Sequence, residues 1–116
     1  MALRNVITGS FVVGQSQTNS VLMNENTLVG LTVTGSYLAA SEITFLVSDD
    51  NSSFYPMYDS SSDEVSLTTG SYARSYSLDA ESFFAWDYVK ARQGNSASAL
   101  NQTIRDIDIK FITKRL

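Results

Sequence analysis

Short segments in which apolar and polar residues alternate recur along most of this chain, and turn-forming residues separate them. The clearest example is the stretch 43–58, where Ile43, Phe45 and Val47 occupy every second position. Side chains of a β-strand point alternately to its two faces, so this spacing predicts a strand with one buried face. The run Asp-Asp-Asn-Ser-Ser that follows favours a turn, and residues 54–58 are expected to return as the second strand of a hairpin.

The same pattern occurs in roughly seven to nine short segments with turn signals about every ten residues, which is typical of an all-β sandwich or barrel. The strands at 27–34 and 104–112 show it most strongly. We expect their apolar faces to lie in the core. These faces are formed by Val29, Leu31, Val33, Ile107, Ile109 and Phe111.

A single helical turn is expected near Asp79–Ala85. Asp79 can cap this turn, because a short acidic side chain can accept hydrogen bonds from the first backbone N–H groups of a helix. Phe83 and Phe84 are expected to pin the turn to the core. Trp86, which follows directly, is also predicted to be buried, in a cluster with Phe45 and Ile109.

The first eleven residues leave two alternatives open. Gly9 and Ser10 interrupt the apolar pattern, so residues 1–11 are either an irregular first strand of the domain or an arm that adds a strand to a neighbouring subunit. In the second case the apolar side chains of this segment would be interface residues. Together with three tyrosines from later strands and turns, the interface candidates are Leu3, Val6, Ile7, Phe11, Tyr55, Tyr58 and Tyr72.

Composition excludes several kinds of site. The 116 residues include neither cysteine nor histidine, so disulfides, thiolate nucleophiles and a Ser-His-Asp site are ruled out. The net charge of −4 makes nucleic acid an unfavourable partner. No apolar run has the length of a signal peptide or a membrane span, so we expect one domain, residues 1–116, that folds in the cytoplasm where it is made, with no membrane partner and no cofactor.

Acidic residues gather in two turns that flank the returning strand of the hairpin. Calcium binds oxygen ligands of this kind, so these residues are candidates for a metal site. The favoured interpretation is that they form turns, because no spaced loop motif fixes a coordination geometry, and we expect no metal and no catalytic residues. The candidates are Asp49, Asp50, Asp59, Asp63 and Glu64.

Two segments carry a resemblance to known folds. The run from Val47 to Tyr55, Val-Ser-Asp-Asp-Asn-Ser-Ser-Phe-Tyr, resembles the "S-x-D-G-x-x-W/F" segment of discoidin-like jelly rolls, with Asn51 near the place of the glycine. The run from Trp86 to Arg92 is similar to their "R-Y-V-R-I" strand. This resemblance implies that the sandwich is a single β-sandwich of jelly-roll type.

The arrangement as a whole resembles small virion structural proteins of tailed bacteriophages, such as capsid decoration or cement proteins. The resemblance implies a non-enzymatic protein on the capsid surface of the virion, which binds the major capsid protein or another virion protein and forms homo-oligomers. The alternative is a carbohydrate-binding module of a phage fibre or adhesin, because exposed tyrosines stack on sugar rings as readily as they anchor protein interfaces. A glycan would then be the partner, bound through Tyr55 or Tyr58.

Overall fold

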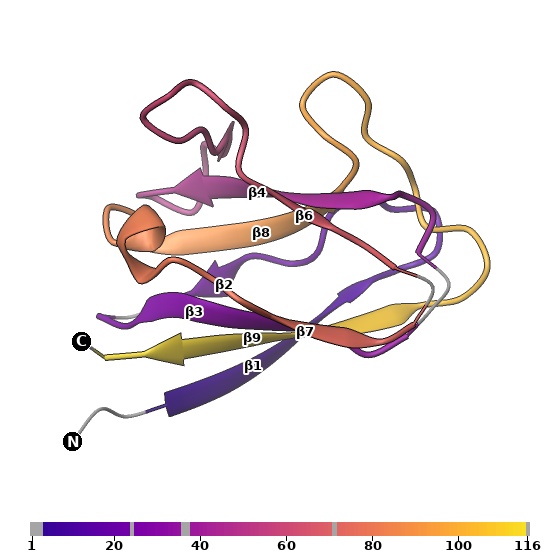
Figure 1. Ribbon diagram of the computed structural model, residues 1–116, viewed down its shortest axis with the longest axis horizontal. Helices are drawn as coiled ribbons and strands as arrows, with labels where there is room; N and C mark the ends of the chain where they lie inside the picture. The colour runs from indigo at the N-terminus through magenta and orange to yellow at the C-terminus, as the bar shows by residue number, and fades with distance from the viewer. Residues whose placement is uncertain (1–3, 24, 36–37, 71, 116) are drawn as a thin grey trace.

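The protein is a sandwich of two antiparallel β-sheets, as Figure 1 shows for a computed structural model of the chain. The structure describes residues 4–23, 25–35, 38–70 and 72–115. The four-stranded sheet has the order β1 (Arg4–Phe11), β9 (Ile107–Lys114), β3 (Thr27–Val33) and β7 (Arg74–Ser77). The five-stranded sheet has the order β2 (Val21–Leu22), β8 (Tyr88–Gln93), β4 (Glu42–Ser48) and β5 (Tyr55–Pro56), with β6 (Ser66–Thr68) also paired to β4.

The order of the strands is that of a jelly roll. The chain crosses from one sheet to the other between β1 and β2, β2 and β3, and β3 and β4, and it crosses again on either side of β7 and between β8 and β9. Each sheet therefore contains strands from both halves of the chain, as two interlocked Greek keys require. The expected all-β jelly-roll sandwich is confirmed.

The predicted hairpin forms one side of the five-stranded sheet, with β4 inside the sheet and β5 at its edge. β4 pairs with β5 through Leu46 and Val47, opposite Pro56 and Tyr55, and on its other side it pairs with β8. Every residue of β4 after Glu42 is buried, because neighbouring strands cover its edges and the other sheet covers one of its faces.

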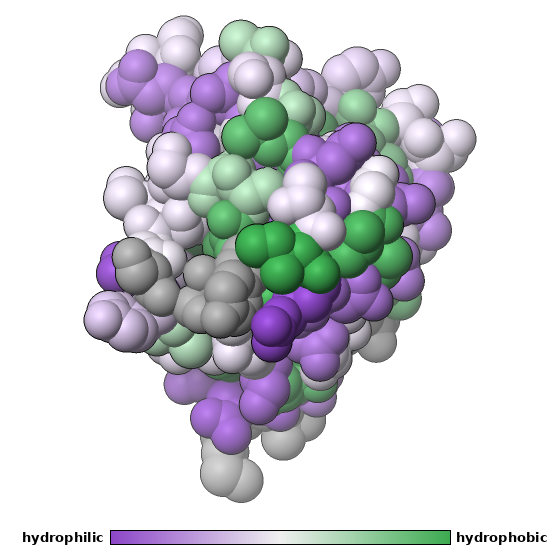
Figure 2. All heavy atoms as spheres, turned by 90° about the vertical axis from the view of Figure 1, so that its right-hand side faces the viewer, coloured by the Kyte–Doolittle hydropathy of each residue, from purple (hydrophilic) through white to green (hydrophobic). Residues whose placement is uncertain are grey.

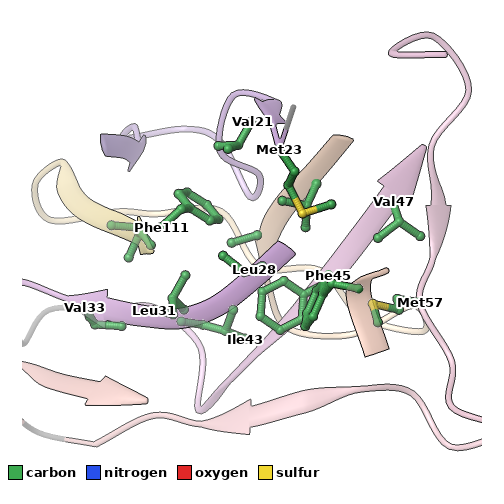
Figure 3. Close-up of a cluster of buried hydrophobic side chains, with 14 of the residues drawn as sticks. Val21, Met23, Leu28, Leu31, Val33, Ile43, Phe45, Val47, Met57 and Phe111 are labelled. Carbon is green, nitrogen blue, oxygen red and sulfur yellow. The ribbon is translucent and has the colours of Figure 1, made fainter. Parts of the chain in front are cut away.

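Both sheets pack against one hydrophobic cluster, part of which is shown in Figure 3. Phe45 of β4 meets Phe83 edge to face, with ring centroids 5.3 Å apart. This T-shaped geometry places the positive edge of one ring against the negative face of the other. Ile107, Ile109 and Phe111 of β9 are buried, as their alternation predicts.

The predicted helical turn is present as the 3₁₀ helix η1 (Ala80–Phe83), and Asp79 caps it by accepting a hydrogen bond from the Glu81 N–H. The prediction that Phe84 and Trp86 are buried is wrong. Phe84 is 59% exposed and Trp86 36% exposed. The physical reason is that one tight turn directs only one of two adjacent side chains inward, and Phe83 fills the place beside Phe45.

A β-bulge changes which residues of β3 face the core, so the prediction that Val29 belongs to the buried face is wrong. The pairing with β9 shifts between Leu28 and Gly30, so Val29 is the additional residue and has no partner on β9. The alternation restarts after the bulge. Leu28, Leu31 and Val33 are therefore buried, whereas Val29 is only partly buried.

The first segment is a regular strand of its own sheet. All eight residues of β1 pair with β9, from Arg4 opposite Lys114 to Phe11 opposite Ile107. Of the two alternatives for residues 1–11, the structure therefore shows the intramolecular strand. β1 is nevertheless an edge strand of the four-stranded sheet.

In the described ranges, no helix has both the length and the apolar character needed to cross a bilayer.

Candidate functional site

Exposed aromatic side chains gather around a groove at the C-terminal end of β4. The groove encloses about 300 Å³, and its lining is mainly apolar. Tyr55 and Tyr58 follow the turn of the hairpin, and Trp86 approaches from the segment that leads into β8. We call this the aromatic groove; its lining residues are Val47, Ser48, Asp49, Ser53, Tyr55, Pro56, Met57, Tyr58 and Trp86.

A polar network holds Tyr58 at the rim of this groove. The hydroxyl groups of Tyr58 and Ser96 are 2.9 Å apart, and Ser96 donates from both its backbone N–H and its hydroxyl to Glu64. Glu64 also forms an ion pair with Arg92. The Tyr58 side chain thus remains exposed for contact, while its hydroxyl is already hydrogen-bonded.

The ion pair at the base of the network is largely buried. The Arg92 guanidinium donates to Glu64 and, through Nε, to the Thr44 hydroxyl at 3.1 Å. Thr44 in turn donates to the Gly94 carbonyl oxygen at 2.8 Å. Removal of either charge would leave the other buried without a partner, which is costly in a low-dielectric interior.

The turn between β4 and β5 forms one wall of the aromatic groove, and Asp50 fixes its shape. One oxygen of the Asp50 carboxylate accepts hydrogen bonds from the N–H groups of Ser52 and Ser53 and from the Ser48 hydroxyl, each at 2.9 Å. The bonds from Ser53, Ser52 and Ser48, in that order of effect, lower the pKa of Asp50 below its usual value. Asn51 completes the turn with a φ of 58°, a left-handed conformation that asparagine tolerates.

A second apolar surface lies at the opposite end of the sandwich. It is built from two segments that run side by side, residues 12–15 after β1 and residues 100–104 before β9. Gly14 donates its N–H to the Gln102 carbonyl oxygen at 2.8 Å, and Gln102 donates its N–H to the Gln15 carbonyl oxygen at 2.9 Å. We call this surface the apolar end; its exposed side chains are Val12, Val13, Leu100 and Ile104.

Figure 2 shows this end of the molecule, where hydrophobic residues form a contiguous patch bordered by hydrophilic ones. Ile104 is the most exposed member of the apolar end, at 63%. Contiguous exposed apolar residues rimmed by polar ones commonly mark interaction sites.

Two buried glutamines support the loops beneath the apolar end. Gln93 donates its side-chain amide to Gln102 at 2.7 Å and accepts from the N–H groups of Ala39 and Ala40 at 2.8 and 3.1 Å. Gln102 donates to the carbonyl oxygen of Arg105 at 2.9 Å. The end of β8 and two connections far apart in the sequence, β3–β4 and β8–β9, are joined through these two side chains.

The structure separates the predicted interface candidates into groups. Tyr55 and Tyr58 meet at the aromatic groove, whereas Tyr72 is 79% exposed and lies outside it. Val6 is exposed on β1, but Ile7 packs on the core and Phe11 is fully buried, so these two cannot anchor a partner. Leu3 lies outside the described residues.

The sequence interpretation missed Trp86 and the whole apolar end. The alternation and aromatic character of this segment predict a buried Trp86, but they do not show which aromatic ring faces the core. The apolar end comes from residues in connections, where no alternation marks them. Ile104 was expected in the strand predicted at 104–112, but the observed strand β9 begins only at Ile107, which leaves Ile104 in the preceding connection.

The acidic residues proposed for calcium are not brought together. Within the described part of the chain, no three Asp or Glu side chains form a group that could hold a metal ion. Asp50 and Asp59 instead accept hydrogen bonds from the N–H groups of their own turns, and Glu64 binds Arg92 and Ser96. Asp50 and Asp59 thus stabilise turns, whereas Glu64 joins β8 to the loop that follows it.

Comparisons with known proteins give a distant likeness of fold and no match of sequence. No protein-family model matches the chain, so the discoidin-like resemblance has no support beyond the jelly-roll topology. No curated protein sequence matches it either. The crystal structure of SPBc2 prophage-derived protein YomS is similar to this chain over 97% of its length and 95% of the length of YomS, with 13% sequence identity and a TM-score of 0.49. These values are too low for the likeness to carry a functional argument.

Proposed function

We propose that this chain is a non-enzymatic structural protein of a phage virion, of the capsid decoration type, which joins neighbouring subunits of the shell. The observation that carries the proposal is the presence of two exposed apolar surfaces, the aromatic groove and the apolar end, at opposite ends of one sandwich. The assignment to a virion is supported by the resemblance of the sequence to small phage structural proteins.

The separation of the two surfaces suits a bridging role. The aromatic groove lies beyond Ser48 at one end of β4, and the apolar end lies past the other end of the sandwich, which measures 39 Å along its longest axis. Seven residues of β-strand already span about 20 Å. A single partner that touched both surfaces would have to wrap around the sandwich, whereas two neighbouring subunits could each occupy one end.

Both surfaces have the composition of protein-binding surfaces. Tyrosine and tryptophan are enriched among the residues that dominate binding energy, because they bury a large area at a small cost in side-chain entropy. The apolar end offers aliphatic side chains on loops that the Gln93–Gln102 pair holds in place. A weak contact at each end is sufficient when many copies bind one shell, because the second contact is then effectively intramolecular.

The proposal is tested with purified capsids of the phage that encodes the chain. The groove variant carries Tyr55→Ser and Trp86→Ser, the end variant carries Leu100→Ser and Ile104→Ser, and Leu22→Ser is the control, because Leu22 is similarly exposed but lies on β2 outside both surfaces. Each double variant should bind capsids at least about tenfold more weakly in co-sedimentation, the loss expected of residues at the centre of an interface. Wild-type binding that survives in both variants would contradict the proposal.

The same variants test the alternative of a carbohydrate-binding module. A glycan that binds saturably to the isolated chain, and loses its binding on Tyr55→Ala or Tyr58→Ala, would identify the aromatic groove as a sugar site. Under the decoration proposal, these substitutions affect capsid binding, and the groove takes an apolar side chain of a protein partner.

A further inference from the structure

A second hollow lies on the outer side of the five-stranded sheet, and none of the exposed apolar side chains of the two surfaces above lines it. It encloses about 460 Å³, within the roughly 300–1,000 Å³ typical of small-molecule sites. One wall is the segment 15–20, which lies along β8, and the other is the turn between β4 and β5. We call it the polar hollow; the residues that matter for its chemistry are Gln15, Gln17, Asn19, Asn51, Phe54 and Lys90.

Four amide side chains that line the polar hollow have no hydrogen-bond partner among the residues that the structure describes. In the described ranges, no hydrogen bond is formed by the side chains of Gln15, Gln17, Asn19 or Asn51. An amide side chain presents two donors and one acceptor oxygen. A sugar hydroxyl both donates and accepts, so a set of free amides suits a ligand rich in hydroxyl groups.

Lys90 is the one charged residue among the described residues that line the polar hollow. The Lys90 ammonium lies 4.4 Å from the centroid of the Phe54 ring, and the two ion pairs among the described residues do not include it. A cation over an aromatic face is held electrostatically without being neutralised. The Lys90 ammonium group is therefore available to pair with an anionic ligand.

No acidic side chain in the described part of the chain lines the polar hollow, although the protein carries 12 acidic against 8 basic residues. The two acids nearest in the sequence point elsewhere. Asp50 accepts three hydrogen bonds from its own turn, and Asp49 lines the aromatic groove. The local charge at the hollow is thus opposite in sign to the charge of the whole protein.

From these features we infer that the polar hollow binds an anionic saccharide, with the amides of Gln15, Gln17, Asn19 and Asn51 on the sugar hydroxyls and Lys90 on a carboxylate or phosphate of the sugar. A single cation and a ring of amides match one charged sugar unit. A polynucleotide would bring many phosphates toward a surface of net negative charge, which repels it.

The inference is tested by nuclear magnetic resonance on the isolated, ¹⁵N-labelled chain, with glucuronic acid, glucose 1-phosphate and uncharged glucose as probes. Saturable shifts are expected at the side-chain amides of the polar hollow. The anionic probes should bind about fivefold more tightly than glucose, as one exposed ion pair allows. A response to glucuronic acid alone or to glucose 1-phosphate alone would support the site and assign its anionic group.

Two variants and a control decide the roles of the residues. Lys90→Met keeps the aliphatic stem on Phe54 and should abolish the preference for the anionic probes, and Gln17→Ala should weaken the binding of all three. Lys110→Met, on the outer face of β9, should change neither result. Unchanged thermal unfolding of each variant shows that it is folded.

The inference would be overturned by the absence of saturable shifts, by an anionic preference that persists in Lys90→Met, or by shifts centred on the aromatic groove. None of these outcomes bears on the bridging proposal, which is tested on capsids with substitutions outside the polar hollow.

Discussion

Three neighbouring aromatic residues, Phe83, Phe84 and Trp86, have different environments in the fold. Phe83 is fully buried against Phe45, whereas Phe84 and Trp86 are exposed. The sequence predicted a buried aromatic cluster here, and hydrophobicity alone could not decide which ring enters the core. The decision depends on the direction in which η1 delivers each side chain, which is set by the tertiary structure.

Truncation of these rings should therefore have unequal effects on stability. Phe83→Ala is expected to lower the free energy of unfolding by about 3–5 kcal/mol, because it removes a buried ring and leaves a cavity. Trp86→Ala should lower it by less than about 1 kcal/mol, as expected for a partly exposed side chain away from the core. Urea unfolding followed by circular dichroism measures both, and a larger loss for Trp86→Ala would show that this assignment of the core is wrong.

The turn that separates the aromatic groove from the polar hollow should loosen in acid. Hydrogen bonds from Ser53, Ser52 and Ser48 lower the pKa of Asp50, so the ionised form is favoured in the folded protein. Its contribution to the order of the turn is present above the ordinary pKa of 3.8 and is lost as the pH falls through the lowered value.

Amide hydrogen exchange of Ser52 and Ser53 provides the measurement. Asp50→Ala should raise their exchange at neutral pH, whereas Asp49→Ala, which removes the adjacent carboxylate, should leave it unchanged. Equal protection in the wild type and in Asp50→Ala would mean that this carboxylate does not fix the turn.

At the scale of elements, the β4–β5 hairpin, η1 and β9 could be predicted from local sequence, because alternation and turn residues are local signals. The bulge at Val29 could not be predicted, since a single unpaired residue leaves the composition of β3 unchanged while it moves Leu28 into the core. The buried pair Gln93 and Gln102 could not be predicted either, because its backbone partners come from two connections that are distant in the sequence.

The first strand can be tested as an element. Deletion of residues 1–10 removes almost all of β1, and with it the pairing of one edge of β9 and the contact of Ile7 with the core. We expect the truncated chain to unfold or aggregate, because β9, paired only with β3, becomes an exposed sheet edge and the core loses apolar cover. A soluble truncated chain with a dispersed nuclear magnetic resonance spectrum would show instead that β1 is a dispensable arm.

For the whole molecule, the architecture could be predicted from the sequence more completely than the binding surfaces could. Repeated short strands and the hairpin predicted a jelly-roll sandwich, and the strand order of both sheets confirms it. Each of the three surfaces combines segments that are distant in the chain. The aromatic groove joins residues 47–58 to Trp86, the apolar end joins residues 12–15 to 100–104, and the polar hollow joins residues 15–20 to 51–54 and Lys90.

The central proposal is that the two ends of the sandwich contact two different neighbours. Its most direct test is photo-crosslinking on assembled capsids, with a benzophenone amino acid placed at Tyr55, at Ile104 or, as a control, at Lys110. The proposal predicts that Tyr55 and Ile104 each crosslink to a virion protein, at different sites on it or to different subunits, and that Lys110 does not. Crosslinks from only one of the two ends, or equal crosslinking from all three positions, would contradict it.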